Sequence, residues 1–283
     1  MENKKIAVVT DSTAYIPDDL IKELDIHVIP LNVNWLGKSY SDNVDISPEE
    51  FYQRLQDEDE LPTTSQPSAG AFQSLFLELS ENYAGVVAVL ISSDLSGTIA
   101  SALAAKDLVG DFPVEVVDSR LTTMALGFLA IRAAQVAQQG GSLEEVVQSA
   151  HSLTGRVRVM FVVDTLEYLH KGGRIGGAKR LLGSLLAMKP LLELVDGKIE
   201  PLDSIRTKKK AIQTMVSYFA NDARGKQDIH MTVFHGVAQE DAEAIQAGVT
   251  KSHNPQTIIM SKLSPVLGVH TGPGTVGIAY YFD

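Results

Sequence analysis

Short apolar runs alternate with longer stretches of helical periodicity through the first half of the chain. The apolar runs predict strands over residues 6–9, 27–33, 85–91 and 114–117. Stretches with apolar residues three or four positions apart predict helices over residues 17–24, 47–56, 68–81, 98–109, 124–139 and 143–153. In helix 68–81, for example, Phe72, Phe76 and Leu79 share one face. Such alternation is typical of βαβ units around a parallel sheet.

The pattern changes in the second half. Helices are predicted over residues 165–169, 178–188, 208–220 and 239–252, and strands over 157–163, 191–195, 198–202, 230–235, 258–262 and 275–282. Asp196-Gly197 is a two-residue hairpin signal, which a purely parallel sheet does not contain. We therefore predict an α/β fold with two domains. Residues 1–155 form a Rossmann-like α/β/α domain with a parallel sheet, and residues 156–283 form a mixed-sheet α/β domain. No long linker separates them, so we expect them to pack closely.

Composition narrows the class of protein. Of the 283 residues, 45% are hydrophobic, which is enough for a sizeable core, and the formal net charge is −11. This charge argues against a nucleic-acid partner, because Lys and Arg neutralise phosphate backbones. The chain has no cysteine, which excludes disulfides and thiolate ligands. The histidines show no metal-binding spacing, so no metal is expected.

Hydropathy bears on location. No segment approaches the ~20 consecutive apolar residues of a membrane-spanning helix. The apolar run 6–9 is too short for the core of a signal peptide. We expect a cytoplasmic protein without stable membrane insertion.

Two hydroxyl-rich segments precede predicted helices. Residues 96–98 follow strand 85–91, and residues 63–68 lead into helix 68–81. The first N–H groups of a helix lack intrahelical partners, so such segments can hold an anion. Neither segment has a neighbouring His, Cys or Lys that could activate a hydroxyl. Two alternatives remain open: Ser96 and Thr98 cap the helix, or Ser96 is a nucleophile with the distant His270 as its base.

Two glycine-rich segments nearly match nucleotide-binding motifs, and both fail. Segment 172–179 resembles a phosphate loop, but Ala178 separates Gly177 from Lys179. Segment 272–277 fits G-x-G-x-x-G, but a predicted strand follows it where the motif requires a helix. We therefore predict no nucleotide site and no cofactor.

Two side chains in glycine-rich surroundings are candidates for function. His270 lies in segment 268–274, which we predict to be a loop, and a loop histidine serves either function or packing. Arg174 lies among four glycines, which should leave it exposed to bind an anion of a partner. The alternative is an incidental arginine in a turn between helices.

Five motifs occur together and in order. They are Thr10-Asp11-Ser12-Thr13, Thr64-Ser65-Gln66-Pro67-Ser68, Leu95-Ser96-Gly97-Thr98, Lys171-Gly172-Gly173-Arg174-Ile175 and His270-Thr271-Gly272-Pro273-Gly274. This combination resembles the DegV family across essentially the whole chain. The resemblance implies that one long-chain fatty acid is held in a tunnel between two α/β domains. It further implies that Thr64, Ser96 and the Gly97 amide bind the carboxylate, with His270 near the same site.

The resemblance also implies a protein partner. Arg174 would dock the ATP-binding kinase subunit of fatty acid kinase, which phosphorylates the presented carboxylate. The acyl phosphate would then feed phospholipid synthesis, and this chain would be a carrier subunit that does not bind ATP. Two other functions remain possible from the sequence: a serine hydrolase or acyltransferase that uses Ser96 and His270, and a lipid-responsive regulatory module.

Overall fold

The first sheet is parallel and covered on both faces. The computed structural model describes residues 4–183 and 188–283. The sheet has the strand order β2 (Ile26–Ile29), β1 (Ile6–Asp11), β6 (Gly85–Leu90) and β7 (Val114–Asp118). Val8 on β1 pairs with Ile26 on one side and Val87 on the other. The central strands β1 and β6 are buried along nearly their whole length, because helices cover both faces of the sheet. This confirms the predicted parallel sheet.

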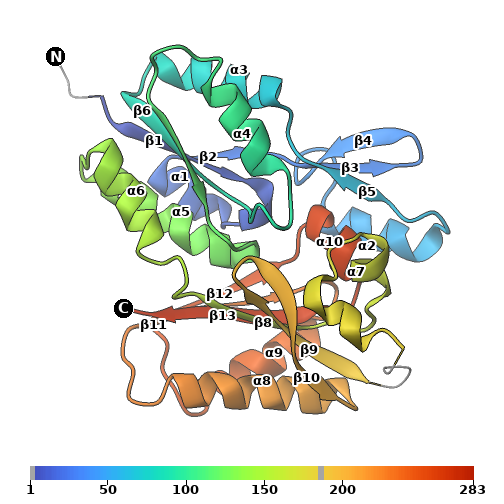
Figure 1. Ribbon diagram of the computed structural model, residues 1–283. Helices are drawn as coiled ribbons and strands as arrows, with labels where there is room; N and C mark the ends of the chain where they lie inside the picture. The colour runs from blue at the N-terminus through green and yellow to red at the C-terminus, as the bar shows by residue number, and fades with distance from the viewer. Residues whose placement is uncertain (1–3, 184–187) are drawn as a thin grey trace.

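The helical layers of this sheet follow from two apolar clusters. One face packs against α3 (Ala69–Ser80) and α4 (Thr98–Lys106). The other face packs against α1 (Asp18–Leu24), α5 (Thr123–Gln138) and α6 (Leu143–His151). Figure 1 shows the sheet between these two layers.

The second sheet is mixed, as predicted. Its strand order is β10 (Lys198–Ile205), β9 (Lys189–Val195), β8 (Arg158–Val162), β13 (Val276–Phe282), β11 (Ile229–His235) and β12 (Thr257–Lys262). The pair β11–β12 is parallel, and the neighbouring pairs are antiparallel. The predicted hairpin joins β9 to β10, and both of its turn residues, Asp196 and Gly197, have positive φ. Helices α8 (Lys208–Asp222) and α9 (Gln239–Thr250) cover its far face (Figure 1).

A small third sheet was not predicted. It is antiparallel, with the order β4 (Lys38–Ser41), β3 (Asn32–Trp35) and β5 (Thr63–Ser65), and it lies beside α2 (Pro48–Asp57). The prediction of one strand over 27–33 was therefore wrong. The chain passes from β2 to β3 at Pro30, which has no N–H to donate to a sheet. The predicted capping of α2 is present, because Ser47 and Glu50 bond each other's backbone N–H.

One apolar core joins the two large sheets. Helix α5 lies between them (Figure 1), and its Met124 and Leu129 belong to the same buried cluster as Val87 and Phe161. The two halves therefore pack closely, as expected. The change from one sheet to the other falls between β7 and β8. The division into two domains at residue 155 stays a prediction.

Two elements near the predicted site differ from expectation. Where a helix was predicted over 178–188, the structure has the 3₁₀ helix η2 (Gly176–Leu181), and residues 184–187 lie outside the described residues. The prediction of a loop over 268–274 was wrong, because α10 (Pro265–Thr271) occupies the first part of this segment and carries His270 in its last turn. Ser264 caps this helix by accepting a hydrogen bond from Leu267 N. In the described part of the chain, no helix is both long and apolar enough to cross a membrane.

Candidate functional site

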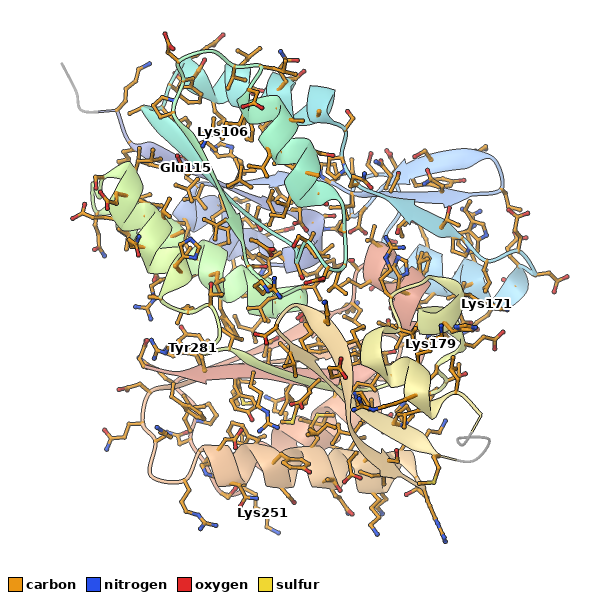
Figure 2. The ribbon with its side chains drawn as sticks, viewed as in Figure 1. Lys106, Glu115, Lys171, Lys179, Lys251 and Tyr281 are labelled. Carbon is orange, nitrogen blue, oxygen red and sulfur yellow. The ribbon has the colours of Figure 1, made fainter. Side chains whose placement is uncertain are left out.

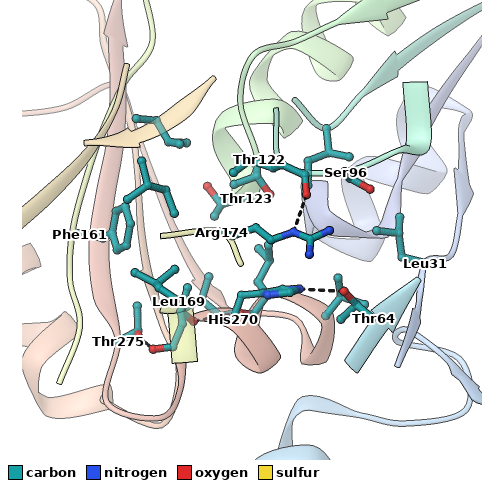
Figure 3. Close-up of a pocket in the computed structure, with 18 of the residues that line it drawn as sticks. Leu31, Thr64, Ser96, Thr122, Thr123, Phe161, Leu169, Arg174, His270 and Thr275 are labelled. Carbon is teal, nitrogen blue, oxygen red and sulfur yellow. Dashed lines mark hydrogen bonds between the residues drawn. The ribbon is translucent and has the colours of Figure 1, made fainter. Parts of the chain in front are cut away.

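A cavity lies between the two large sheets, at the end of the parallel strands. Parallel strands of an open sheet bring their C-terminal loops to one edge, so segments 92–98 and 118–123 meet there. Apolar side chains from both halves wall the cavity, including Ile91, Leu95, Phe161, Leu194, Phe234 and Leu267. Polar side chains gather around it (Figure 3), namely Thr64, Ser96, Thr122, Arg174 and His270.

The cavity is narrow. It has a volume of about 70 Å³. Walls this close suit a thin, unbranched apolar chain better than a ring system. The cavity is thus apolar along its walls and polar where the predicted site residues meet.

His270 and Thr64 are 206 positions apart in sequence and bonded in space. His270 Nε2 lies 2.8 Å from Thr64 Oγ1. Burial, together with the nearby Arg174 charge, lowers the pKa of His270 to about 4, so the imidazole is neutral at pH 7. A neutral Nε2–H that donates to Thr64 leaves the Thr64 hydroxyl hydrogen free for a ligand oxygen. Gly172 permits this packing, because a Cβ there would lie 2.3 Å from His270 Nδ1.

Arg174 lies across the cavity rather than out in solvent. It is half-buried, its Nε donates to Leu95 O at 3.0 Å, and its Nη1 donates to Gly172 O at 2.9 Å. Figure 3 shows the side chain between Ser96 and His270. The expectation of an exposed arginine was therefore wrong, because the carbonyl oxygens of Leu95 and Gly172 hold the guanidinium at the cavity. Its role in docking a partner stays a prediction.

Ser96 and Gly97 precede α4 at the same cavity. Gly97 is the N-cap residue, and no side chain caps the helix. Ser96 Oγ lies 2.8 Å from Thr98 Oγ1 and only weakly approaches Thr98 N, at 3.4 Å. Apart from this contact of Thr98 N, the start of α4 has no capping side chain at its N-cap, and N–H groups at such a helix start can bind an anion. The Gln66 amide packs close to this position, since a Cβ at residue 97 would lie 2.8 Å from Gln66 Nε2.

The predicted alternative pair of Ser96 and His270 is not formed. His270 Nε2 bonds with Thr64, and Ser96 Oγ bonds with Thr98. The imidazole is therefore hydrogen-bonded to the Thr64 hydroxyl and not to that of Ser96. This geometry favours binding of a ligand over activation of Ser96 as a nucleophile.

Two threonines of the lining, Thr122 and Thr123, were not predicted as site residues. Thr122 is buried, and within the described residues its Oγ1 has no hydrogen-bond partner. Thr123 begins α5 with φ +58°. This backbone conformation is uncommon for a β-branched residue and costs energy, so it persists only where the surrounding structure holds it. Their only signal is position, since they follow β7 by a few residues, at the same sheet edge as Ser96. An unpaired hydroxyl in the lining favours a ligand with polar atoms.

The site offers hydroxyls, amides, one imidazole and a guanidinium. Within residues 4–183 and 188–283, no three His, Cys, Asp or Glu side chains are grouped closely enough to hold a metal ion. The donor set fits an organic anion, because hydroxyls, amides and Arg all donate hydrogen bonds.

Comparison with known proteins decides the family. The family model described as "Uncharacterised protein, DegV family" matches residues 5–283. The chain belongs to the DegV family. Solved structures of DegV proteins share its fold across nearly the whole length. A fatty-acid-binding DegV protein from Thermus thermophilus is 36% identical, with a TM-score of 0.94, covering 99% of this chain and 100% of its own.

Two further solved structures are similar. DegV of Bacillus subtilis, described as a fatty acid binding protein, is 36% identical with a TM-score of 0.92 and covers 99% of this chain and 100% of its own. A stearic-acid-binding protein from Eubacterium ventriosum is 26% identical with a TM-score of 0.85 and covers 98% of each chain. These relatives confirm the predicted family and the two-part α/β fold of this DegV chain.

Proposed function

We propose that this protein binds one long-chain fatty acid in the cavity between its large sheets. The carboxylate is held by Thr64, Ser96, the Gly97 amide and His270, beside the Arg174 charge. The observation that carries this proposal is a narrow apolar cavity with a cluster of hydrogen-bond donors at the same site. It is supported by similar solved structures that are described as fatty-acid-binding proteins.

The energetics of such a ligand fit the cavity. Burial of ~14 methylenes at ~0.8 kcal/mol each supplies ~11 kcal/mol before the cost of ordering the chain. An unpaired carboxylate would cost several kcal/mol on burial. The hydroxyls of Thr64 and Ser96 offset that cost without proton transfer, and neutral His270 orients the first of them.

We further propose that the protein presents this carboxylate to a separate ATP-dependent kinase subunit in the cytoplasm. The acyl phosphate then feeds phospholipid synthesis, and the chain acts as a carrier and not as an enzyme. Support comes from the hydrogen-bond donors of the site, because a carboxylate held by them is already nucleophilic and needs only a phosphoryl donor. Under this proposal the donor belongs to the partner.

The test combines lipid retention with phosphorylation. We expect the purified protein to carry a fatty acid, identified by mass spectrometry after extraction, and to support acyl phosphate formation with its kinase. Thr64→Ala combined with Ser96→Ala should abolish acyl phosphate formation. Thr214→Ala with Ser217→Ala removes two hydroxyls from α8, which lies on the far side of the mixed sheet, and should change neither property. Normal phosphorylation by the first double variant would refute the carboxylate assignment.

Arg174 has its own test, because it lines the cavity and is also the predicted docking residue. Arg174→Ala that keeps its lipid but loses kinase coupling supports docking. Loss of the lipid itself would show that the guanidinium serves the ligand.

A further inference from the structure

A second pocket lies against the polar cluster of the site. It has a volume of about 330 Å³ and shares Thr64, Arg174 and His270 with the apolar cavity. We term these three side chains the polar partition, because one set of residues borders both spaces. The apolar cavity is narrow, whereas the second pocket has room for a hydrated polar group.

The second pocket is positively charged in a strongly acidic protein. Lys171 and Arg174 line it, and none of the described residues that line it is acidic, although the chain carries a net charge of −11. Such a local reversal of sign concentrates anions. The ring of Tyr168, also in the lining, packs against Gly272, where a Cβ would lie 2.4 Å from the ring.

The Lys171 ammonium is available for exchange. It pairs with Glu167 at 2.6 Å, but 56% and 57% of the two side chains are exposed. An ion pair this exposed contributes little stability. A doubly charged anion in the second pocket can therefore replace Glu167 as the ion-pair partner of Lys171.

We propose that the second pocket binds a phosphoryl group and that Lys171 is the cation that recognises it. The group is first the terminal phosphate of a nucleoside triphosphate held by the partner, and then the phosphate of the acyl phosphate product. This inference rests on the proposed function, since it requires a carboxylate at the polar partition.

The chemistry follows from which side of the partition each reactant occupies. The acyl chain fills the apolar cavity, so the phosphorus must reach the carboxylate from the second pocket. A carboxylate oxygen forms a new bond to the terminal phosphorus of the nucleoside triphosphate. The bond between that phosphorus and the oxygen that bridges it to the next phosphate breaks, and the nucleoside diphosphate leaves with the electron pair of the broken bond. No proton is transferred, because the carboxylate is ionised. Positive charge from Lys171 and Arg174 stabilises the charge on the transferring group.

The test uses a stable analogue of the product. In a long-chain 2-oxoalkyl phosphonate, a methylene replaces the bridging oxygen of an acyl phosphate. Lys171→Gln should weaken phosphonate binding about tenfold, the loss of one hydrogen bond to a charged group, and leave fatty-acid binding unchanged. Lys171→Arg, which keeps the charge, should retain phosphonate affinity. The matched control is Lys179→Gln, an exposed lysine that does not line the pocket (Figure 2).

The outcomes separate this inference from the function on which it rests. Equal phosphonate affinity of the wild type and Lys171→Gln would overturn it. An equal loss of both ligands in Lys171→Gln would overturn it as well, because Lys171 would then serve the carboxylate or the fold. A wild-type protein that binds the fatty acid but not the phosphonate refutes only the phosphoryl pocket. A protein that binds neither ligand refutes the proposed function too.

Discussion

Acidification should destabilise the folded protein through His270. The unfolded chain takes up a proton on this histidine as the pH falls through about 6.5, but the folded protein keeps the imidazole neutral down to about pH 4. Between these values the unfolded state binds more protons, so stability rises with pH across the window. The difference of 2.5 between the two pKa values corresponds to about 3 kcal/mol of unfolding free energy.

The assay is urea unfolding of lipid-free protein between about pH 7 and about pH 4, with His270→Gln measured beside the wild type. The stability advantage of the wild type over the variant should shrink by about 3 kcal/mol as the pH falls. His151→Gln, which changes an exposed histidine on α6, is the matched control for the loss of an imidazole away from the cavity. A pH-independent difference for His270→Gln would refute the reasoning, because His270 would then titrate as an ordinary, solvated histidine.

Two further predictions concern buried groups around the site. Burial raises the pKa of Asp42 to about 7, so the folded protein keeps a proton that the unfolded chain loses, and stability falls as the pH rises from about 3.8 to about 7. In urea unfolding, the unfolding free energy of Asp42→Asn should therefore rise relative to that of the wild type by up to about 4 kcal/mol as the pH increases across that window. A difference between the two proteins that stays constant with pH would contradict this. Gly172→Ala places a Cβ 2.3 Å from His270 Nδ1 and should cost about 1–3 kcal/mol in thermal unfolding. Its control, Gly70→Ala, has its nearest atom at 3.8 Å and should not destabilise; equal effects of the two would contradict a clash.

The regular elements could be predicted because their signals are local. The parallel strands carry continuous apolar runs, and the hairpin carries Asp196-Gly197 at its turn. The segment around His270 was predicted to be a loop because it is rich in glycine. The helix-start signal before it, Ser264 as N-cap followed by Pro265, was given too little weight. The small third sheet was missed because its strands are short and its pairing depends on tertiary contacts.

The site could be predicted only in part. The motifs at Thr64 and Ser96 were visible in the sequence, and the C-terminal ends of parallel strands lie at one edge of a sheet, which accounts for the nearness of Ser96 and Thr122 in the structure. The bond between Thr64 and His270 spans most of the chain, so no local pattern reports it. The inward position of Arg174 depends on the carbonyl of Leu95, 79 positions away.

The central claim is that an apolar cavity ends in a clamp for a carboxylate. Its most direct test is to offer the lipid-free protein an equal mixture of a long-chain fatty acid and its methyl ester, and to measure the bound species by native mass spectrometry. The ester has the same chain but cannot present a charged head to Thr64, Ser96 and Arg174. The clamp predicts one fatty acid per chain and almost no ester. Equal occupancy by the two ligands, or binding of neither, would contradict it.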